Sequence, residues 1–182
     1  VEVTGPNGNI WMDRNLGATQ AATSSTDAAA YGYLYQWGRG SDWHESRTSG
    51  TISSQYAGDT PNHRNFIFGH FNWRSTQNDN LWQGVNGINN PCPVGYRIPT
   101  EAELEGLGII DKYTALRNPL KLSLVGARDY INGALDNLGI SGNYWSSSVS
   151  GSNARHFNIN SFGYIFGSAF RAFGMAVRCI KD

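Results

Sequence analysis

The chain has little charge, and what it has is balanced. Only 15% of its 182 residues are charged, below the usual quarter, and 14 basic residues offset 14 acidic ones. Because the formal net charge is zero, the chain as a whole has no electrostatic attraction to nucleic acid or to an anionic membrane, and we expect neither as a partner. The basic residues are 11 Arg and only 3 Lys, which favours fixed, planar hydrogen bonding over a solvated cationic surface.

Long hydrophobic runs are missing as well. No apolar stretch is long enough to span a bilayer, so we expect no direct membrane insertion by this domain. The chain begins VEVTGPNG, without Met or a signal peptide, and we interpret it as a mature fragment or an excised domain. Its length predicts one domain over residues 1–182, able to bury about 70% of the surface that the unfolded chain exposes, so folding requires no metal.

Cysteine is scarce, with only Cys92 and Cys179. A disulfide between them would close a long loop and contribute roughly 4–5 kcal/mol in the chain-entropy model. The alternative is two unpaired buried thiols. The residues alone leave both interpretations open.

Metal-binding and catalytic motifs are absent. No metal-ligand spacing relates the four histidines, which are His44, His63, His70 and His156. Carboxylates cluster only over 101–105, where the first turn of a helix favours negative charge. There is no G-x-S-x-G elbow, no phosphate loop, and none of the Glu-Pro-Asn, Gln-Pro-Asp or Trp-Asn-Asp elements of calcium-dependent lectins. We therefore expect no metal, no cofactor and no enzymatic activity.

Glycine and aromatic residues are abundant, at 22 Gly and 13% aromatics, which is typical of a loop-rich protein with an aromatic core. Residues 8–18 (GNIWMDRNLGA) read as a short strand between turns. The aromatics of 31–39 (YGYLYQWGR) alternate as in a strand, although the preceding Asp27-Ala-Ala-Ala would also begin a helix, and both readings stay open. Residues 40–90 have no clear period and predict long loops with brief strands.

One helix has a strong local signature. In 97–108 (RIPTEAELEGLG) Thr100 and Glu103 form a capping box, Leu104 and Leu107 make an apolar stripe, and a glycine ends the helix. A second short helix is expected over 111–117.

The remainder of the chain predicts β structure, with strands over 122–130, 143–148, 155–160 and 173–180 separated by Gly-rich turns. In 155–160 we expect Phe157 and Ile159 on one face and His156, Asn158 and Asn160 on the other. In the final strand we expect Met175, Val177 and Cys179 to share a face.

The stretch SVSGSNARHFNINSFGYIFGSAFRAFG, residues 148–174, concentrates aromatics among Gly, Ser, Asn and Ala. Binding surfaces of antibodies combine large aromatic anchors with small, adaptable polar residues in this way. We interpret 156–173 as a surface loop segment that presents a ligand-binding face. Its candidate residues are His156, Asn158, Asn160, Phe162, Tyr164, Phe166, Ser168, Phe170 and Phe173.

Several elements resemble the Fibrobacter succinogenes major paralogous domain: IWMDRNLGA, YGYLYQWG, NPCPVGYRIPTEAELE, NYWSSSV and GMAVRCIKD. The resemblance runs from about residue 9 to the C-terminus. It implies an α+β, C-type lectin-like fold of the formylglycine-generating-enzyme-like subtype, with antiparallel sheets, one or two short helices and long loops. It also implies an extracytoplasmic protein, secreted or on the cell surface of a Bacteroidetes-type bacterium, in which Cys92 and Cys179 pair.

RIPTEAELE also resembles the corresponding element of formylglycine-generating and related sulfatase-modifying proteins. Those enzymes act through a closely spaced cysteine pair near the C-terminus, whereas this chain has only Cys179 there. No catalytic residue therefore transfers to this sequence.

The 3′-encoded part of the chain resembles variable proteins of diversity-generating retroelements. These proteins carry Trp-Ser-Ser, then a hypervariable segment, then Arg-x-x-Gly and Val-Arg, which match 145–147, 171–174 and 177–178 here. Randomised Asn codons yield Phe, Tyr, Ser, His, Asn, Ile, Gly, Ala or Arg but never Lys, Glu, Gln, Met or Trp, and 148–174 lacks all five.

These observations predict a receptor- or adhesin-type module whose variable aromatic surface binds a protein or glycan on another cell or host surface. Trp145, Arg178 and the disulfide would form its scaffold, with Arg178 in buried hydrogen bonds. The first alternative is a fixed-specificity carbohydrate-binding or structural domain of a surface lipoprotein, binding through exposed Trp43, Trp73 or Trp82. The second is a sulfatase-modifying-type enzyme, which would require a free thiol.

Overall fold

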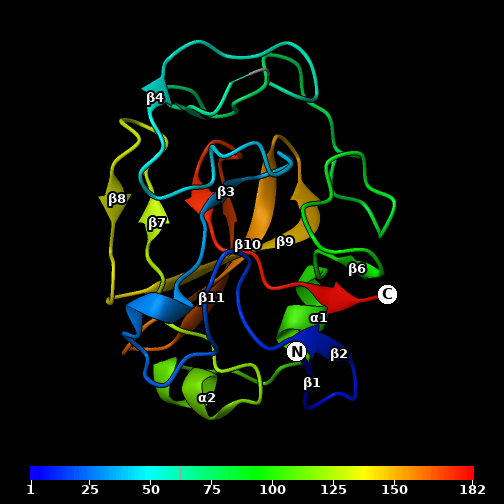
Figure 1. Ribbon diagram of the computed structural model, residues 1–182, viewed down its shortest axis with the longest axis vertical. Coiled ribbons are helices and arrows are strands. Elements are labelled where there is room, and N and C mark those ends of the chain that lie inside the picture. Colours follow the sequence, from blue (N-terminus) through cyan, green and yellow to red (C-terminus); the bar gives the residue numbers. More distant parts are fainter. Residues whose placement is uncertain (62) are drawn as a thin grey trace.

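A computed structural model describes residues 1–61 and 63–182. These described residues form four small β-sheets, two short α-helices and one 3₁₀ turn, joined by long loops (Figure 1). The elements are β1 Glu2–Thr4, β2 Ile10–Met12, η1 Ala28–Ala30, β3 Tyr35–Gln36, β4 Thr51–Ile52, β5 Phe66–Ile67, β6 Tyr96–Arg97, α1 Glu101–Glu105, α2 Lys112–Arg117, β7 Ala127–Arg128, β8 Leu135–Asp136, β9 Gly142–Ser150, β10 Asn153–Ile159, β11 Tyr164–Ala169, β12 Gly174–Met175 and β13 Ile180–Lys181. This mostly β arrangement with two short helices is an α+β fold, as predicted. No helix in the described part of the chain has the length and apolar character needed to cross a membrane.

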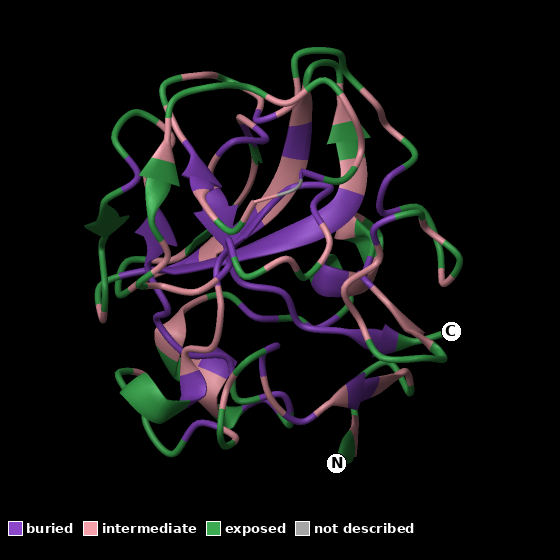
Figure 2. Cartoon of the chain, turned by 45° about the horizontal axis from the view of Figure 1, so that its top comes forward, coloured by how far each residue is buried: buried purple, intermediate pink, exposed green. Residues whose placement is uncertain are grey.

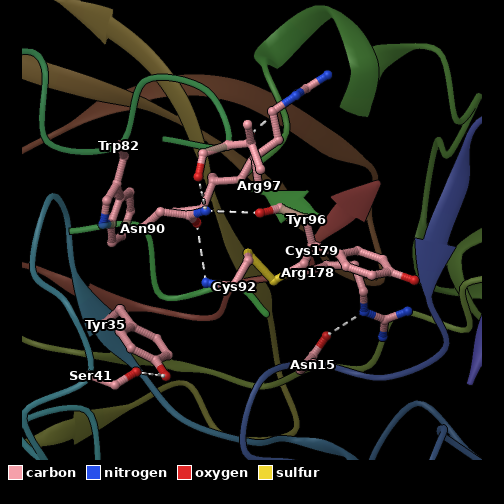
Figure 3. The surroundings of a disulfide bond; sticks show 12 residues. Asn15, Tyr35, Ser41, Trp82, Asn90, Cys92, Tyr96, Arg97, Arg178 and Cys179 are labelled. Carbon is pink, nitrogen blue, oxygen red and sulfur yellow. Dashed lines mark hydrogen bonds between the residues drawn. A yellow bond between two sulfur atoms is a disulfide. The ribbon is translucent and has the colours of Figure 1, made fainter. Parts of the chain in front are cut away.

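The two ends of the chain meet in one antiparallel sheet of order β1-β2-β13-β6 (Figure 1). Beside it Cys92 and Cys179 form a disulfide with Cα atoms 5.9 Å apart, which confirms the predicted pairing (Figure 3). The bond fixes the segment before β6 to the segment that enters β13. It therefore adds a covalent link to a sheet built from opposite ends of the sequence.

The longest strands form the antiparallel sheet β11-β10-β9, which crosses the middle of the molecule (Figure 2). The interpretation of 156–173 as a loop is wrong, because His156 to Ile159 lie in β10 and Tyr164 to Ala169 form β11. The Asn160 side-chain oxygen accepts hydrogen bonds from the backbone N–H groups of Phe162 and Gly163 and thereby closes the turn between the strands. Gly and Ser weaken strand propensity, but every residue of β11 pairs with a residue of β10, from Tyr164 with Ile159 to Ala169 with Ala154.

The two faces of this sheet pack differently. Phe157 and Ile159 are fully buried in a core cluster with Tyr144 of β9. On the opposite face His156 and Asn158 keep part of their surface exposed. The predicted alternation within 155–160 is confirmed, since successive strand residues point to opposite faces.

A second core cluster lies on the other side of the sheet. It contains Trp145 together with Met175, Val177 and Cys179, so the predicted common environment of these last three residues is confirmed. They do not form one continuous strand, because 173–180 divides into β12 and β13, which belong to different sheets. The indole N–H of Trp145 donates to the backbone oxygen of Tyr35 at 2.8 Å and ties the sheet to β3.

Arg178 has the buried hydrogen-bonding role that was predicted. It is 2% exposed, and its guanidinium donates to Asn15 Oδ1 at 3.1 Å and to the backbone oxygen of Leu120 at 2.6 Å. Burial lowers the pKa of Arg178 to about 10, with the charge of Arg14 adding to the effect. Arg178 thus connects an N-terminal loop to the segment after α2.

The remaining β structure is short. β3, β12, β7 and β8 form an antiparallel sheet, and β4 pairs in parallel with β5 inside the long loops of 40–90. Over 27–39 the structure contains a part of each open alternative: residues Ala28–Ala30 form a 3₁₀ turn, and the strand is limited to β3. The predicted strand over 122–130 is limited to β7.

Both predicted helices form. Thr100 and Glu103 make the complete capping box of α1, and Leu104 and Leu107 are buried beneath it. Asp111 caps α2 by accepting hydrogen bonds from the backbone N–H groups at 113 and 114. These local signals were sufficient because each cap satisfies its own helix end.

Candidate ligand-binding face

A hollow of about 400 Å³ opens beside the exposed face of β10. We call it the hairpin hollow. Its walls come from β7–β8, β9, β10, β11, β12 and the segment that joins β11 to β12. Five of the nine candidate residues line it, namely His156, Asn158, Ser168, Phe170 and Phe173.

Neutral amides dominate one wall of the hairpin hollow. Asn158 donates to Asn143 Oδ1 at 2.7 Å, and Asn143 donates in turn to Ser141 Oγ and to the backbone oxygen of Gly126, both at 3.1 Å. An Asn side chain offers two N–H donors and an oxygen with two lone pairs. Asn158 uses one N–H donor for Asn143, so it can still form hydrogen bonds with another group. The wall therefore fixes the amide orientations and still offers hydrogen bonds to a ligand.

His156 lies beneath these amides. Burial lowers the pKa of His156 to about 4, and the charge of Arg155 adds to the effect. The imidazole is therefore neutral near pH 7 and contributes packing and neutral hydrogen-bonding groups to the hollow. Its position requires glycine opposite, because a Cβ on Gly167 would lie 2.9 Å from His156 Cε1.

An aromatic ridge borders the hairpin hollow. The Phe170 ring stacks on Phe71 with centroids 4.3 Å apart, and Tyr130 meets both Phe170 and Phe173 edge-on at 5.1 and 4.7 Å. Phe71 is 64% exposed, so the ridge presents apolar surface to solvent. Offset and edge-to-face contacts of this kind hold the rings rigidly, which lowers the entropy cost of binding against them.

A second hollow of about 430 Å³ lies on the other side of Phe170. We call it the loop hollow, since the long loops of 40–90 supply most of its wall. Its lining includes Gln55, His70, Phe71, Asn72, Arg74 and Gln77. Sequence reasoning missed these residues and Tyr130, because irregular loops carry no periodic signal that brings 55, 71, 130 and 170 together.

Four candidate residues lie outside both hollows. Asn160 holds the β10–β11 turn, Phe162 is fully exposed at that turn, and Tyr164 is 48% exposed on β11. Phe166 packs on the other face of the sheet, where its ring stacks on buried Phe157 at 4.6 Å. Five of the nine candidates therefore line the hairpin hollow. Asn160, Phe162 and Tyr164 lie at or next to the β10–β11 turn, and Phe166 packs against the core.

The described residues contain one group with three potential metal ligands, formed by Asp42, His44 and Glu45. His44 Nε2 accepts the backbone N–H of Gln36 at 3.0 Å, which places the imidazole proton on Nδ1, and Nδ1 donates to Asp42 Oδ1 at 2.5 Å. A metal at Nδ1 would have to displace that proton while Nε2 remains unprotonated. This arrangement is a hydrogen-bond network that does not suit a metal ion.

The predicted bridge occupies both cysteines of the chain, so no free thiol is present. The free thiol that a sulfatase-modifying mechanism would need is thus missing in this state.

No protein-family model matches the chain, and neither curated proteins nor solved structures show a significant similarity to it.

Proposed function

We propose that this chain is a ligand-binding module of C-type lectin-like fold, without enzymatic activity. The observation that carries the proposal is the aromatic ridge of Phe71, Tyr130, Phe170 and Phe173, flanked by two hollows with neutral polar walls. Ligand sites typically combine a concave apolar surface with a few placed polar groups, and their volumes begin near 300 Å³. The ligand is a protein or glycan on another cell or host surface.

We further propose that a retroelement diversifies this face. All nine candidate positions keep part of their side chains exposed, while the intervening Phe157 and Ile159 are fully buried. The landmarks that flank such segments, Trp145 and Arg171, are also buried. Substitutions at the positions that line the hairpin hollow, and at Phe162, would therefore change the binding surface, whereas Phe166 stacks on buried Phe157 and Asn160 closes the β10–β11 turn.

The resemblance to the Fibrobacter succinogenes major paralogous domain supports an extracytoplasmic location, secreted or on the cell surface. The disulfide agrees with an oxidising compartment, where such bonds form and persist.

The fixed-specificity alternative expected binding through exposed tryptophans, and two of the three that it named are buried. Trp73 and Trp82 are each 1% exposed, and their indole N–H groups donate to backbone oxygens of the core. Of its three named tryptophans only Trp43 remains exposed.

The proposal is tested by probing arrays of glycans and of bacterial and host surface proteins with wild type, Phe170→Ala and the exposed control Val94→Ala. We expect Phe170→Ala to weaken every specific signal by about 30-fold, the typical effect of removing a central aromatic anchor. Val94→Ala should bind as wild type, since Val94 is fully exposed and lines neither hollow. Signals that survive Phe170→Ala but vanish in Trp43→Ala would favour the fixed-specificity alternative.

A further inference from the structure

A separate pocket of about 280 Å³ is lined by Tyr33, Tyr35, Ser41, Trp43 and Glu45. It shares no lining residue with the hairpin hollow or the loop hollow. Three of its five residues are aromatic, and only one carries a charge. The Tyr35 hydroxyl lies 3.1 Å from Ser41 Oγ, so these two hydroxyl groups are already hydrogen-bonded to each other (Figure 3).

The backbone of Trp43, which lines this pocket, has an unfavourable conformation. Its φ is 76°, a left-handed backbone conformation that bulky residues rarely adopt, and its side chain is 58% exposed. Strained backbone of this kind is concentrated at ligand sites, where the surrounding structure enforces it. The Arg64 guanidinium carbon lies 5.8 Å from the Trp43 ring centroid, so the ring already makes one cation–π contact within the chain.

Glu45 brings a buried carboxylate with one unpartnered oxygen to the pocket. The residue is 4% exposed, and among the described residues no group hydrogen-bonds to Glu45 Oε2, which is itself buried. His44 Nδ1 lies 3.3 Å from Glu45 Oε2, but its proton points to Asp42 Oδ1 at 2.5 Å. A buried carboxylate without a donor is unfavourable unless a cation pairs with it.

The neighbouring carboxylate of Asp42, in contrast, has hydrogen-bond donors. Asp42 accepts from Arg39 Nη2 at 2.6 Å as well as from His44. Burial opposes its ionisation, but these hydrogen bonds and the Arg39 charge outweigh burial and hold the pKa of Asp42 at about 2. Arg39 thus pairs directly with Asp42, whereas it acts on Glu45 only through the electrostatic field and leaves Glu45 Oε2 without a donor.

We propose that this aromatic pocket binds a quaternary ammonium cation, such as the trimethylammonium group of choline. Aromatic faces and one carboxylate attract such a cation, which needs no hydrogen-bond acceptor. A quaternary ammonium has no N–H donors to satisfy, which matches a lining in which three of the five residues are aromatic. The same chemistry is found in free choline and in a trimethylated lysine side chain.

The test is titration of the folded chain with choline, followed by tryptophan fluorescence and calorimetry. The other five tryptophans are at most 1% exposed, so a fluorescence change in this pocket reports on Trp43. We expect saturable binding, with 3,3-dimethyl-1-butanol, a neutral isostere, binding at least about tenfold more weakly. A trimethyllysine peptide in a parallel titration distinguishes the source, because tighter binding than choline assigns the site to a protein ligand and weaker binding to a small molecule.

Two variants locate the site. Glu45→Gln keeps the side-chain shape and should weaken choline binding about tenfold, and Trp43→Ala should abolish the fluorescence response and weaken calorimetric binding similarly. Phe71→Ala, which removes an exposed ring of the ligand-binding face, should bind choline as wild type does. Absence of saturable choline binding, equal binding of the isostere, or unchanged affinity in folded Glu45→Gln would overturn the proposal. None of these results bears on the ridge between the two hollows.

Discussion

Replacing both Cys92 and Cys179 by Ala lowers the free energy of unfolding by about 4–5 kcal/mol. The two residues are 87 apart in sequence, so their bond removes a large loop-closure entropy from the unfolded chain. The effect is large for this fold in particular, because β1, β2, β6 and β13 form one sheet from opposite ends of the chain, and β6 and β13 are only two residues long. The bond holds this sheet where strand pairing alone is limited.

Equilibrium unfolding in guanidinium measures this change. Val94→Ala, a fully exposed position two residues from Cys92, is the control and should match wild type within about 0.5 kcal/mol. Wild type under reducing conditions should approach the double variant. A double variant as stable as oxidised wild type would show that the packing around the sheet suffices and that the bond contributes little.

Acidification from pH 7 to pH 4 should destabilise wild type by about 3 kcal/mol more than His156→Asn. The pKa of His156 is lowered to about 4 by burial, against an ordinary value of 6.5. Between these two values the unfolded chain binds a proton that the folded chain excludes, so stability falls as the pH falls through this window. Each pH unit of this window contributes about 1.4 kcal/mol, which makes about 3 kcal/mol an upper value.

Asparagine keeps a neutral polar group at 156 but does not titrate, so the difference between the two chains isolates the imidazole. Asp42 does not interfere, since its pKa of about 2 lies below the window. Thermal unfolding of both proteins across pH 4 to 7 measures the difference. Parallel pH profiles for wild type and His156→Asn would mean that the histidine is accessible to protons in the folded state.

Local signals in the sequence predicted local structure well. The capping box of Thr100 and Glu103 and the alternation around Phe157 and Ile159 need only neighbouring residues, and both are present in the structure. Local signals did not predict that residues 164–169 form the strand β11. Its Gly- and Ser-containing sequence forms a strand because β10 lies beside it, which is a property of pairing and not of the segment itself.

Only a part of the candidate site could be predicted from the sequence, because the rest depends on contacts between distant segments. The sequence indicated Phe170 and Phe173, but their partners Phe71 and Tyr130 come from distant loops and have no periodic pattern that links them. The aromatic content of 156–173 also misplaced Phe166, whose position opposite Phe157 depends on strand register. Residue chemistry indicated the candidate groups, whereas strand register and long-range loop packing determine which of them meet.

We propose that the exposed positions of the β10–β11 region form a diversified binding face. Deep sequencing of the 3′ end of this gene across a bacterial population tests it most directly. We predict substitutions concentrated at 156, 158, 162, 164, 170 and 173, with Phe157, Ile159 and Arg171, which are at most 1% exposed, unchanged. A uniform 3′ end, or substitutions spread equally over buried and exposed positions, would contradict the account.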